Sequence, residues 1–454
     1  MTAISDEVAQ VSSAAETTYM PGLSLRTNFS WTLLGNIVYS GCQWGMVVIL
    51  AKLGSPIMVG QFALGLAVTA PIIMFANLQL RAVQATDAKH EYLFGDYLGL
   101  RLIAILLALV VIIAISLFSG YRTETMLVIL AVGVAKVFES ISDVFFGLLQ
   151  QHERMDRIAK SMMLKGFLSL LALGIGVYLT RSTLWGVIGL AVAWALILVY
   201  YDLKSGVLIL RLSQITDPSA NIKIDDSTLS PRWDKAKLRK LALLALPLGF
   251  VMLLISLNVN IPRYFIEYYL GERQLGIFAA ISYLMVVGTT IVNALGQSAS
   301  PRLAKYYAAG NYKLFVNLLA KLVIIGVLLG LAGFLVVFVA GREVLDLLYR
   351  PEYAKHVDIF LWLMVAAGIN YIASFLGYGI TAARYFKVQM PLFAFVVVAL
   401  VAACFWLIPV YGLLGATIAL VVAAIVQALG SMAILVAMFR LHRGFEGSVK
   451  HEQE

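Results

Sequence analysis

Long apolar runs separated by short polar stretches follow one another along almost the whole chain of 454 residues. An α-helix needs about 20 apolar residues to cross a bilayer, so each such run is a candidate span. The runs number twelve, with approximate limits 29–50, 57–80, 97–118, 126–149, 161–180, 184–203, 241–262, 276–297, 318–340, 358–382, 389–409 and 412–438. The pattern therefore predicts an all-α membrane protein with twelve transmembrane helices.

Composition supports this fold class and excludes others. The chain is 61% hydrophobic and 13% charged, with a mean hydropathy of +0.89, whereas a soluble domain carries about 25% charged residues. Too little polar sequence remains for a separate soluble domain. In a membrane protein the basic residues serve topology first, so we do not assign the net charge of +9 to a nucleic-acid partner.

The distribution of Lys and Arg predicts the orientation. With the N-terminus in the cytoplasm, 25 of the 34 basic residues lie on the cytoplasmic side, eight lie on the opposite side, and Lys136 lies within the membrane. Cytoplasmic loops carry such an excess. We therefore expect a multi-pass protein with both termini cytoplasmic and with residues 1–28 and 439–454 as tails.

One long polar connection, residues 204–240, divides the spans into two groups of six. This predicts an N-terminal six-helix bundle at 29–203, a cytoplasmic linker at 204–240 and a C-terminal six-helix bundle at 241–438. Four identical pairs lie 216 positions apart in the two halves, namely Gly60/Gly276, Phe62/Phe278, Ala63/Ala279 and Asn77/Asn293. Six is an even number, so the halves would be parallel repeats about an axis along the membrane normal, with a substrate pathway between them.

The fourth span carries three charges, Lys136, Glu139 and Asp143, which share one helix face. Facing lipid they would cost on the order of 8–10 kcal/mol together. One interpretation is that they line a central cavity, where Lys136 meets an anionic headgroup and Glu139 or Asp143 takes up a coupling ion. The other is a buried ion-pair network that holds the helices in register.

Polar side chains at helical spacing mark two further spans. The first span has a stripe that includes Asn36, Tyr39 and Gln43, and the second span ends with Asn77 and Arg81. These residues could line the inner half of a hydrophilic path. They could equally form hydrogen bonds between packed helices.

The seventh span ends with Asn260, Pro262 and Arg263. Pro262 frees a backbone carbonyl and can kink the helix end. Arg263 could receive a phosphate or an acidic sugar at the exit side. Alternatively, it extends to the interface and pairs with Glu267.

Several reaction classes find no support in the sequence. There is no Gly-x(4)-Gly-Lys-Ser/Thr phosphate loop and no zinc-protease helix motif. The two cysteines, Cys42 and Cys404, lie in apolar runs and indicate no disulfide or metal framework. The outer loops are too short for the catalytic loop expected of a glycan polymerase or ligase. We expect no enzymatic activity, no cofactor and no metal site.

Four blocks of sequence resemble the polysaccharide flippases of the O-antigen and exopolysaccharide type. The blocks are Asn28 to Gly54, Ala135 to Met155, Asn260 to Phe278 and Tyr411-Gly412-x-x-Gly415. These flippases belong to the superfamily that includes the multidrug and toxin extrusion transporters. The resemblance implies two six-helix bundles arranged in a V, with alternating access to a central cavity.

The resemblance also implies a cargo and a location. The cargo would be a polyprenyl-diphosphate-linked oligosaccharide, flipped from the inner to the outer leaflet of the bacterial plasma membrane for surface polysaccharide biosynthesis. Membrane lipids and a glycan polymerase would be its partners. Glu139 and Asp143 are the candidate ion-coupling residues, and the candidate substrate-binding residues are Lys136, Asn36, Tyr39, Gln43, Asn77, Arg81, Asn260 and Arg263. The alternative is a cation-coupled multidrug antiporter of the same superfamily, which a net acidic cavity would suit.

Overall fold

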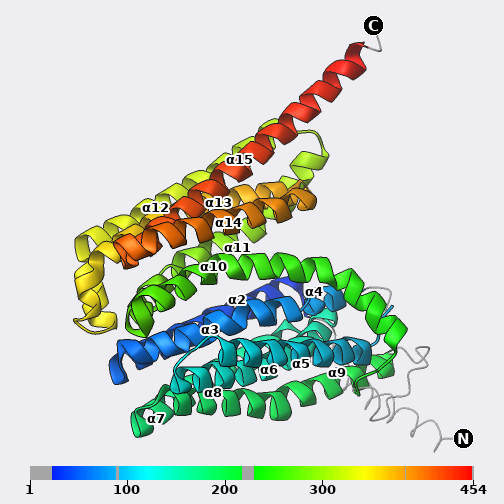
Figure 1. Cartoon of the computed structure of the whole chain (residues 1–454). Coiled ribbons are helices and arrows are strands. Elements are labelled where there is room, and N and C mark those ends of the chain that lie inside the picture. Colours follow the sequence, from blue (N-terminus) through cyan, green and yellow to red (C-terminus); the bar gives the residue numbers. More distant parts are fainter. Residues whose placement is uncertain (1–22, 88–90, 217–229, 384, 452–454) are drawn as a thin grey trace, which may run out of the picture. The chain divides into compact units, whose positions relative to one another are not determined.

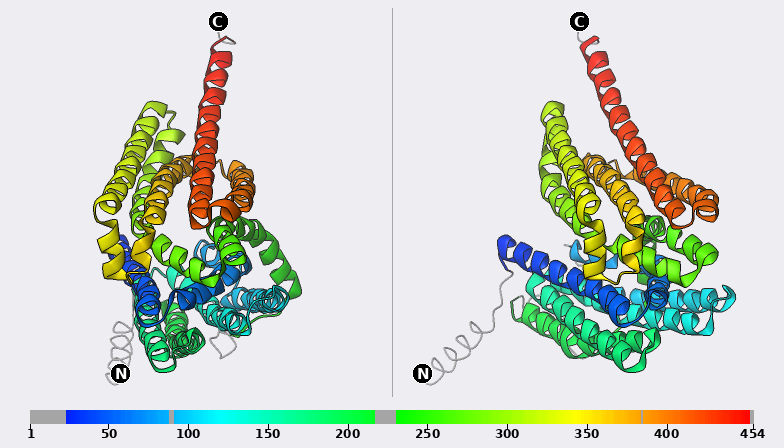
Figure 2. Two further views of the ribbon diagram at one scale, coloured as in Figure 1. Left: turned by 60° about the vertical axis from the view of Figure 1, so that its left-hand side comes forward. Right: turned by 90° about the vertical axis from the view of Figure 1, so that its left-hand side faces the viewer.

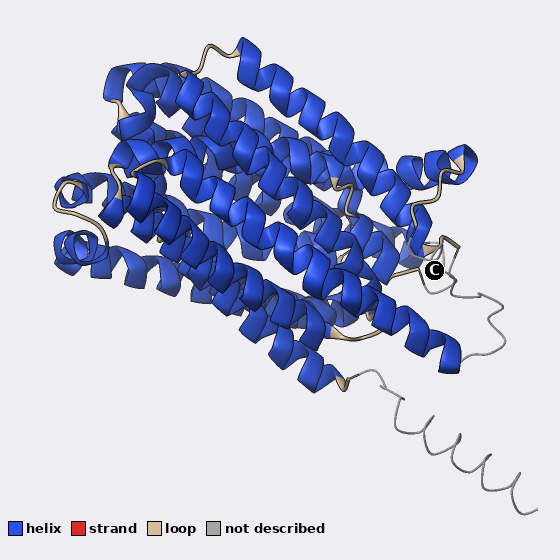
Figure 3. Ribbon diagram, turned by 90° about the horizontal axis from the view of Figure 1, so that it is seen from below, coloured by secondary structure: helices blue, strands red, loops and turns tan. Residues whose placement is uncertain are grey.

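The structure, a computed structural model, describes residues 23–87, 91–216, 230–383 and 385–451. All regular elements in these ranges are helices, as Figures 1 and 3 show. The helices of the N-terminal half are α2 (Leu25–Leu53), α3 (Pro56–Ala76), α4 (Leu80–Ala85), α5 (Phe94–Phe118), α6 (Thr123–Gln151), α7 (Met155–Thr180), α8 (Thr183–Ile197), the π-helical turn η1 (Leu198–Asp202) and α9 (Leu203–Thr216). Those of the C-terminal half are α10 (Lys235–Tyr283), α11 (Val286–Ala308), α12 (Tyr312–Leu348), the short η3 (Tyr353–His356), α13 (Val357–Ala382), α14 (Phe386–Tyr411) and α15 (Leu413–His451).

Eleven helices in the described ranges are long and apolar enough to cross a membrane. The difference from twelve lies in the seventh and eighth expected spans. α10 has 49 residues, but Gly271 has φ 82° and ψ 174°, which is not helical and divides α10 into two helices. The eighth expected span, 276–297, begins in the second of these and continues in α11 after a turn at Leu284 and Met285. The predicted all-helical membrane fold is confirmed.

The described helices form two compact units whose limits differ from the predicted bundles. Unit 1 comprises the described residues of 1–46 and 68–253, and unit 2 comprises the described residues of 47–67 and 254–454. The division of the chain into bundles at 203 and 241 stays a prediction. Because α2, α3 and α10 are long continuous helices, the chain passes from one unit to the other within each of them, rather than at a loop.

The predicted linker and tails also differ in their described parts. The linker 204–240 begins with helix α9 and ends within α10, while residues 217–229 lie outside the described residues. α15 continues to His451, so the predicted C-terminal tail at 439–454 is helical over most of its length. The predicted N-terminal tail ends within α2, and residues 1–22 lie outside the described residues.

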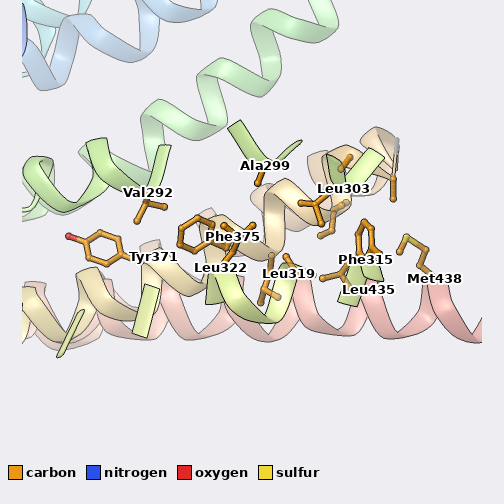
Figure 4. Packing of buried hydrophobic residues seen from close by; sticks show 14 of the residues in the cluster. Val292, Ala299, Leu303, Phe315, Leu319, Leu322, Tyr371, Phe375, Leu435 and Met438 are labelled. Carbon is orange, nitrogen blue, oxygen red and sulfur yellow. The ribbon is translucent and has the colours of Figure 1, made fainter. Parts of the chain in front are cut away.

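Unit 2 has an apolar core between α11, α12, α13 and α15. Phe315, Leu322 and Phe375 are buried in it, and Figure 4 shows Phe375 beside Leu322 and Phe315 beside Leu435 and Met438. α13 packs against both α12 and α15, and α14 packs against α15, which the two views of Figure 2 also show. Burial of such side chains provides the dispersion contacts that hold membrane helices together.

The closest helix contact in unit 2 joins two glycines that the sequence repeat pairs. A Cβ on Gly60 would lie 1.9 Å from the carbonyl oxygen of Glu272, and a Cβ on Gly276 would lie 1.8 Å from that of Pro56. The two glycines are 216 positions apart, and so are their contact partners Pro56 and Glu272, so each contact is the repeat-related counterpart of the other. A two-fold axis between α3 and the second part of α10 requires this reciprocity.

We predict that Gly276→Ala destabilises the protein, because the new methyl group overlaps the backbone of α3 and the helices must separate. Overpacking of this kind costs typically about 1–3 kcal/mol. Thermal unfolding of the detergent-purified protein measures the effect. The control is Gly377→Ala in α13, where a Cβ would meet no atom within 4 Å, and where alanine is the better helix former. Equal melting temperatures for the two variants would contradict the close contact.

Candidate functional site

Unit 1 contains a cavity of about 520 Å³ that α2, α3, α4, α6, α7 and α10 enclose. Its apolar lining includes Phe146, Met162 and Met252. Its charged and polar lining residues are Tyr39, Asn77, Gln79, Arg81, Glu139, Ser140, Asp143, Gln150 and Lys165. Five of these nine belong to the set predicted from sequence, so the structure brings residues from three predicted spans to one place.

Helix α6 supplies both carboxylates of the cavity. Lys136 Nζ lies 2.6 Å from Glu139 Oε2, and the Tyr39 hydroxyl donates to Glu139 Oε1 at 2.9 Å. Lys136 also lies 5.3 Å from the centre of the Trp194 ring on α8. The Lys136 ammonium is thus held by a carboxylate and an aromatic face. Lys136 adjoins the cavity through Glu139 and is not itself part of the lining.

Asp143, one turn further along α6, is bound by two arginines. Arg101 on α5 lies 2.9 Å from Asp143 and also donates a hydrogen bond to Asn77, and Arg81 lies 3.8 Å from Asp143. The Arg101 side chain is fully buried. Arg101 is one of the 25 basic residues that the topology assigns to the cytoplasmic side, and this assignment did not predict its contact with Asp143. Arg101 lies a full turn inside the apolar run 97–118, and this position could have indicated a buried arginine with a partner on another helix.

A break in the second predicted span places Arg81. Leu78 and Gln79 have φ values of 50° and 52° and end α3, so Arg81 lies on the separate short helix α4. The expectation that Asn77 and Arg81 follow one continuous helix is therefore wrong. From α4, the Arg81 Nε donates to Gln150 at 2.9 Å, and the guanidinium lies 5.5 Å from the centre of the Phe146 ring.

Lys165 is a second cavity cation that the sequence analysis did not identify. Its Nζ lies 2.8 Å from Asp202, whose other oxygen accepts from Ser161 at 2.5 Å. Asp202 is 0% exposed and is the last residue of the π-helical turn η1. Such a turn changes the helical spacing and therefore the direction in which the side chains of this span point. The sequence signal was an aspartate at the end of the apolar run 184–203. Because charged residues are common at the ends of membrane spans, this aspartate did not indicate a buried ion pair.

Basic side chains outnumber acidic ones around the cavity. Counting the lining residues and their direct partners gives four basic side chains, Arg81, Arg101, Lys136 and Lys165, against three acidic ones, Glu139, Asp143 and Asp202. With all of them ionised the cluster carries one net positive charge. Charges beside low-dielectric protein act on one another more strongly than charges in bulk water.

The remaining predicted residues lie elsewhere. Asn36 is exposed and Gln43 is half-buried, and neither lines the cavity. Asn260 and Arg263 belong to unit 2, where the Arg263 guanidinium donates to Asn260 Oδ1 at 3.2 Å. Asn260 in turn donates to the Ser256 carbonyl at 2.9 Å, which makes it a helix-internal contact.

We predict that Asp143→Asn destabilises the protein, because it leaves the fully buried Arg101 without a carboxylate. Removing one partner of a buried pair costs about 3–5 kcal/mol. Thermal unfolding in detergent measures the loss, and Glu124→Gln in the exposed first turn of α6 is the matched control. Replacing both charges, by Arg101→Met with Asp143→Leu, should recover much of the stability. An Asp143→Asn variant as stable as the control would contradict this account.

Comparisons with known proteins identify the family. The chain matches the polysaccharide biosynthesis protein family over residues 25–307. It is 30% identical over 408 residues to the capsular polysaccharide biosynthesis protein CapF of Staphylococcus aureus. The aligned region covers 88% of this chain and 96% of CapF.

Solved structures show the same fold at low identity. The lipid II flippase MurJ in an inward closed conformation has a TM-score of 0.65 and 12% identity, with 89% of this chain and 87% of that chain covered. An inward-facing multidrug resistance MATE family transporter of the MOP superfamily has a TM-score of 0.60 and 18% identity, with 93% and 97% covered. The chain therefore shares the fold of these transporters. The chain is a multi-pass membrane protein that belongs to the polysaccharide biosynthesis protein family.

Proposed function

We propose that the protein flips a polyprenyl-diphosphate-linked oligosaccharide from the inner to the outer leaflet of the bacterial plasma membrane by alternating access. Both termini would lie in the cytoplasm, where the excess of Lys and Arg predicts them. Membership in the polysaccharide biosynthesis family supports the glycan cargo. The observation that carries the proposal is the unit 1 cavity, whose lining offers Arg81 and Lys165 to an anionic group.

The two lining cations suit a diphosphate. Arg81 presents a planar fork of donors that matches phosphate oxygens, and Lys165 presents a compact charge with three donors. Both are preorganised, Arg81 by Gln150 and Phe146, and Lys165 by Asp202, which also accepts from Ser161. A cavity of about 520 Å³ has the size of a small-molecule site. It would hold the diphosphate and the adjoining sugar while the polyprenyl chain remains in lipid.

The role of Lys136 changes in the light of its contacts. The sequence suggested that Lys136 itself meets the headgroup, but its ammonium is engaged by Glu139 and faces the Trp194 ring. We propose that Lys136 and Tyr39 hold Glu139 in place and set the charge of the cavity. Arg81 and Lys165 then contact the phosphates directly.

Charge balance suggests ion coupling. A diphosphate brings more negative charge than the single excess positive charge of the cluster neutralises, and an uncompensated charge in a membrane is costly. Protonation of Glu139 or Asp143 on substrate binding would restore the balance. Glu139 faces Lys136 on its own helix, Tyr39 on α2 and Lys165 across the cavity. Asp143 already has two arginine partners, so Glu139 is the better candidate.

A cation-coupled multidrug antiporter has less support from this site. Cationic drugs favour a cavity with an excess of carboxylates, and the residues here leave an excess of one cation. The family and its structural neighbours are flippases and transporters rather than enzymes. A glycan polymerase is proposed as a partner that uses the flipped product.

We predict that Arg81→Gln lowers surface polysaccharide when it replaces the wild-type protein in a strain lacking the gene. The pair Lys165→Gln with Asp202→Asn should do the same, and it avoids leaving Asp202 charged and unpaired. Each loss of a charged hydrogen bond should weaken binding of a polyprenyl diphosphate to the purified protein by about tenfold or more. Polysaccharide immunoblots and a binding titration measure the two effects.

The control for these variants is Lys204→Gln, an exposed basic residue of α9 that lies over Tyr200 and not at the cavity. All variants must accumulate in the membrane to wild-type levels. Normal polysaccharide and unchanged binding in the Arg81 and Lys165 variants would remove these residues from the mechanism. An altered susceptibility to cationic dyes without a glycan defect would favour the antiporter.

We predict that Glu139→Gln uncouples transport from the proton gradient. The neutral amide keeps the acceptor for Tyr39 but cannot exchange a proton, so flipping should lose its dependence on pH. A flippase assay in proteoliposomes, with an imposed pH gradient and a sodium gradient in separate runs, measures this. The control is Glu124→Gln. A Glu139→Gln variant that still responds to the pH gradient as the wild type does would contradict the assignment.

A further inference from the structure

Helix α11 of unit 2 has a polar side, although it continues the eighth expected membrane span. Eleven helices in the described ranges are apolar enough to cross a membrane, and α11 is not one of them. Val292, Ala299 and Leu303 lie on one side of α11 and are buried in the core of unit 2, as Figure 4 shows. Asn293 and Gln297 lie one turn apart on another side and are exposed. Two amides therefore stand on the outside of a helix within the expected span.

Helix α13 carries a second polar stripe. Asn370 and Ser374 lie one turn apart, and both are half-buried. Tyr371 and Phe375, which follow them directly, are buried in the core of unit 2. Asn370 is at the middle of the tenth expected span, 358–382, so this stripe lies at a depth where water is absent from a bilayer.

The two stripes are neighbours because α11 and α13 pack side by side. A Cβ on Gly288 would overlap the Tyr371 hydroxyl, and a Cβ on Gly296 would overlap the Tyr378 ring. These pairs increase together along both helices, so the helices are parallel. Tyr378, one turn after the α13 stripe, donates to Asn293 Oδ1 at 3.4 Å and so joins the two stripes. The polar face of unit 2 is the surface formed by Asn293, Gln297, Asn370, Ser374 and Tyr378.

The polar face has hydrogen-bonding groups that the fold does not use. The side chains of Asn370 and Ser374 form no hydrogen bond within the described part of the chain, although a helical serine commonly bonds the carbonyl four residues before it. Asn293 uses its Oδ1 for Tyr378, and its amide N–H groups stay available. Gln297 also contacts Tyr378. Polar groups without partners are costly against lipid tails, so a hydrophilic ligand or water must cover this face.

The chemistry of the polar face suits a neutral, hydroxyl-rich ligand. Its five side chains are amides, hydroxyls and one phenol, and none is charged. A carboxamide both donates and accepts hydrogen bonds, and a tyrosine offers an apolar ring beside its hydroxyl. These groups complement a sugar better than a phosphate. Asn293 is also the repeat counterpart of Asn77, which lines the cavity of unit 1.

We propose that the polar face of unit 2 binds the oligosaccharide of the cargo, with hydrogen bonds from Asn293, Asn370 and Ser374 to sugar hydroxyls. This inference rests on the proposed function. The unit 1 cavity would hold the diphosphate and one adjoining sugar, so the remaining sugars need another surface. A site that hydrogen-bonds hydroxyls discriminates strongly, because a ligand without the matching hydroxyl leaves the polar groups of the site unpaired. The polar face would therefore determine which glycan is transported.

The test compares two ligands in binding titrations with the purified, full-length protein. One is a polyprenyl diphosphate, and the other is the lipid-linked oligosaccharide isolated from the host strain. The wild type should bind the glycosylated lipid more tightly. The double variant Asn370→Ala with Ser374→Ala should weaken that binding by about tenfold or more and leave binding of the bare lipid unchanged. Arg81→Gln should weaken binding of both lipids.

The double variant removes no hydrogen bond of the described fold, so it should unfold at the wild-type temperature. Asn293→Ala tests the contribution of α11 and should weaken binding of the glycosylated lipid by several-fold. The matched control is Ser298→Ala with Asn317→Ala, which changes exposed residues of α11 and α12 outside the polar face.

The outcomes separate this inference from the proposed function. Undiminished binding of the glycosylated lipid by the double variant or by Asn293→Ala would overturn the inference alone. An equal loss of binding for both lipids in the double variant would also overturn it, because the effect would then not concern the sugars. A wild-type protein that binds neither lipid would contradict the proposed function and this inference with it.

Discussion

The cost of placing charge inside a membrane governs the structure of unit 1. Asp143 on α6 is paired with Arg101 from α5 and with Arg81 from α4. Those contacts in turn require that α3 stop at Leu78 and Gln79, so that α4 can carry Arg81 toward α6. The same constraint applies to Asp202, which is fully buried and relies on Lys165 and Ser161. Each carboxylate therefore fixes the relative positions of at least two helices.

This arrangement unites the two interpretations that the sequence left open. Buried ion pairs are weak evidence for stability, because desolvation offsets the attraction. Here the pairs do more than hold helices, since Glu139, Asp143, Arg81 and Lys165 each present part of the side chain to one cavity. A network whose members are also accessible to a ligand can exchange partners when an anion arrives. Under the proposed function, the same residues would therefore both hold the helices in register and bind the substrate.

The all-helical fold and the charged residues of α6 could be predicted from the sequence, whereas the other charged residues around the cavity could not. Lys136, Glu139 and Asp143 stood out because they interrupt the middle of an apolar run, where the membrane tolerates charge least. Arg101, Lys165 and Asp202 lie nearer the ends of their runs, where charges are common, so their burial was invisible. It depends on which distant helix covers them, and local sequence does not contain that information. The breaks at Leu78–Gln79 and Leu284–Met285 carry neither glycine nor proline, and only tertiary packing explains them.

The reciprocal approach of Gly60 to Glu272 and of Gly276 to Pro56 also bears on how the chain is built. Phe62 and Phe278, and likewise Ala63 and Ala279, are buried to nearly the same degree on the two sides of this contact. A side chain added at either glycine would meet the same obstacle, a backbone carbonyl of the facing helix. The two positions therefore restrict the sequence as one symmetric pair, and a change that one of them cannot accept is equally excluded at the other.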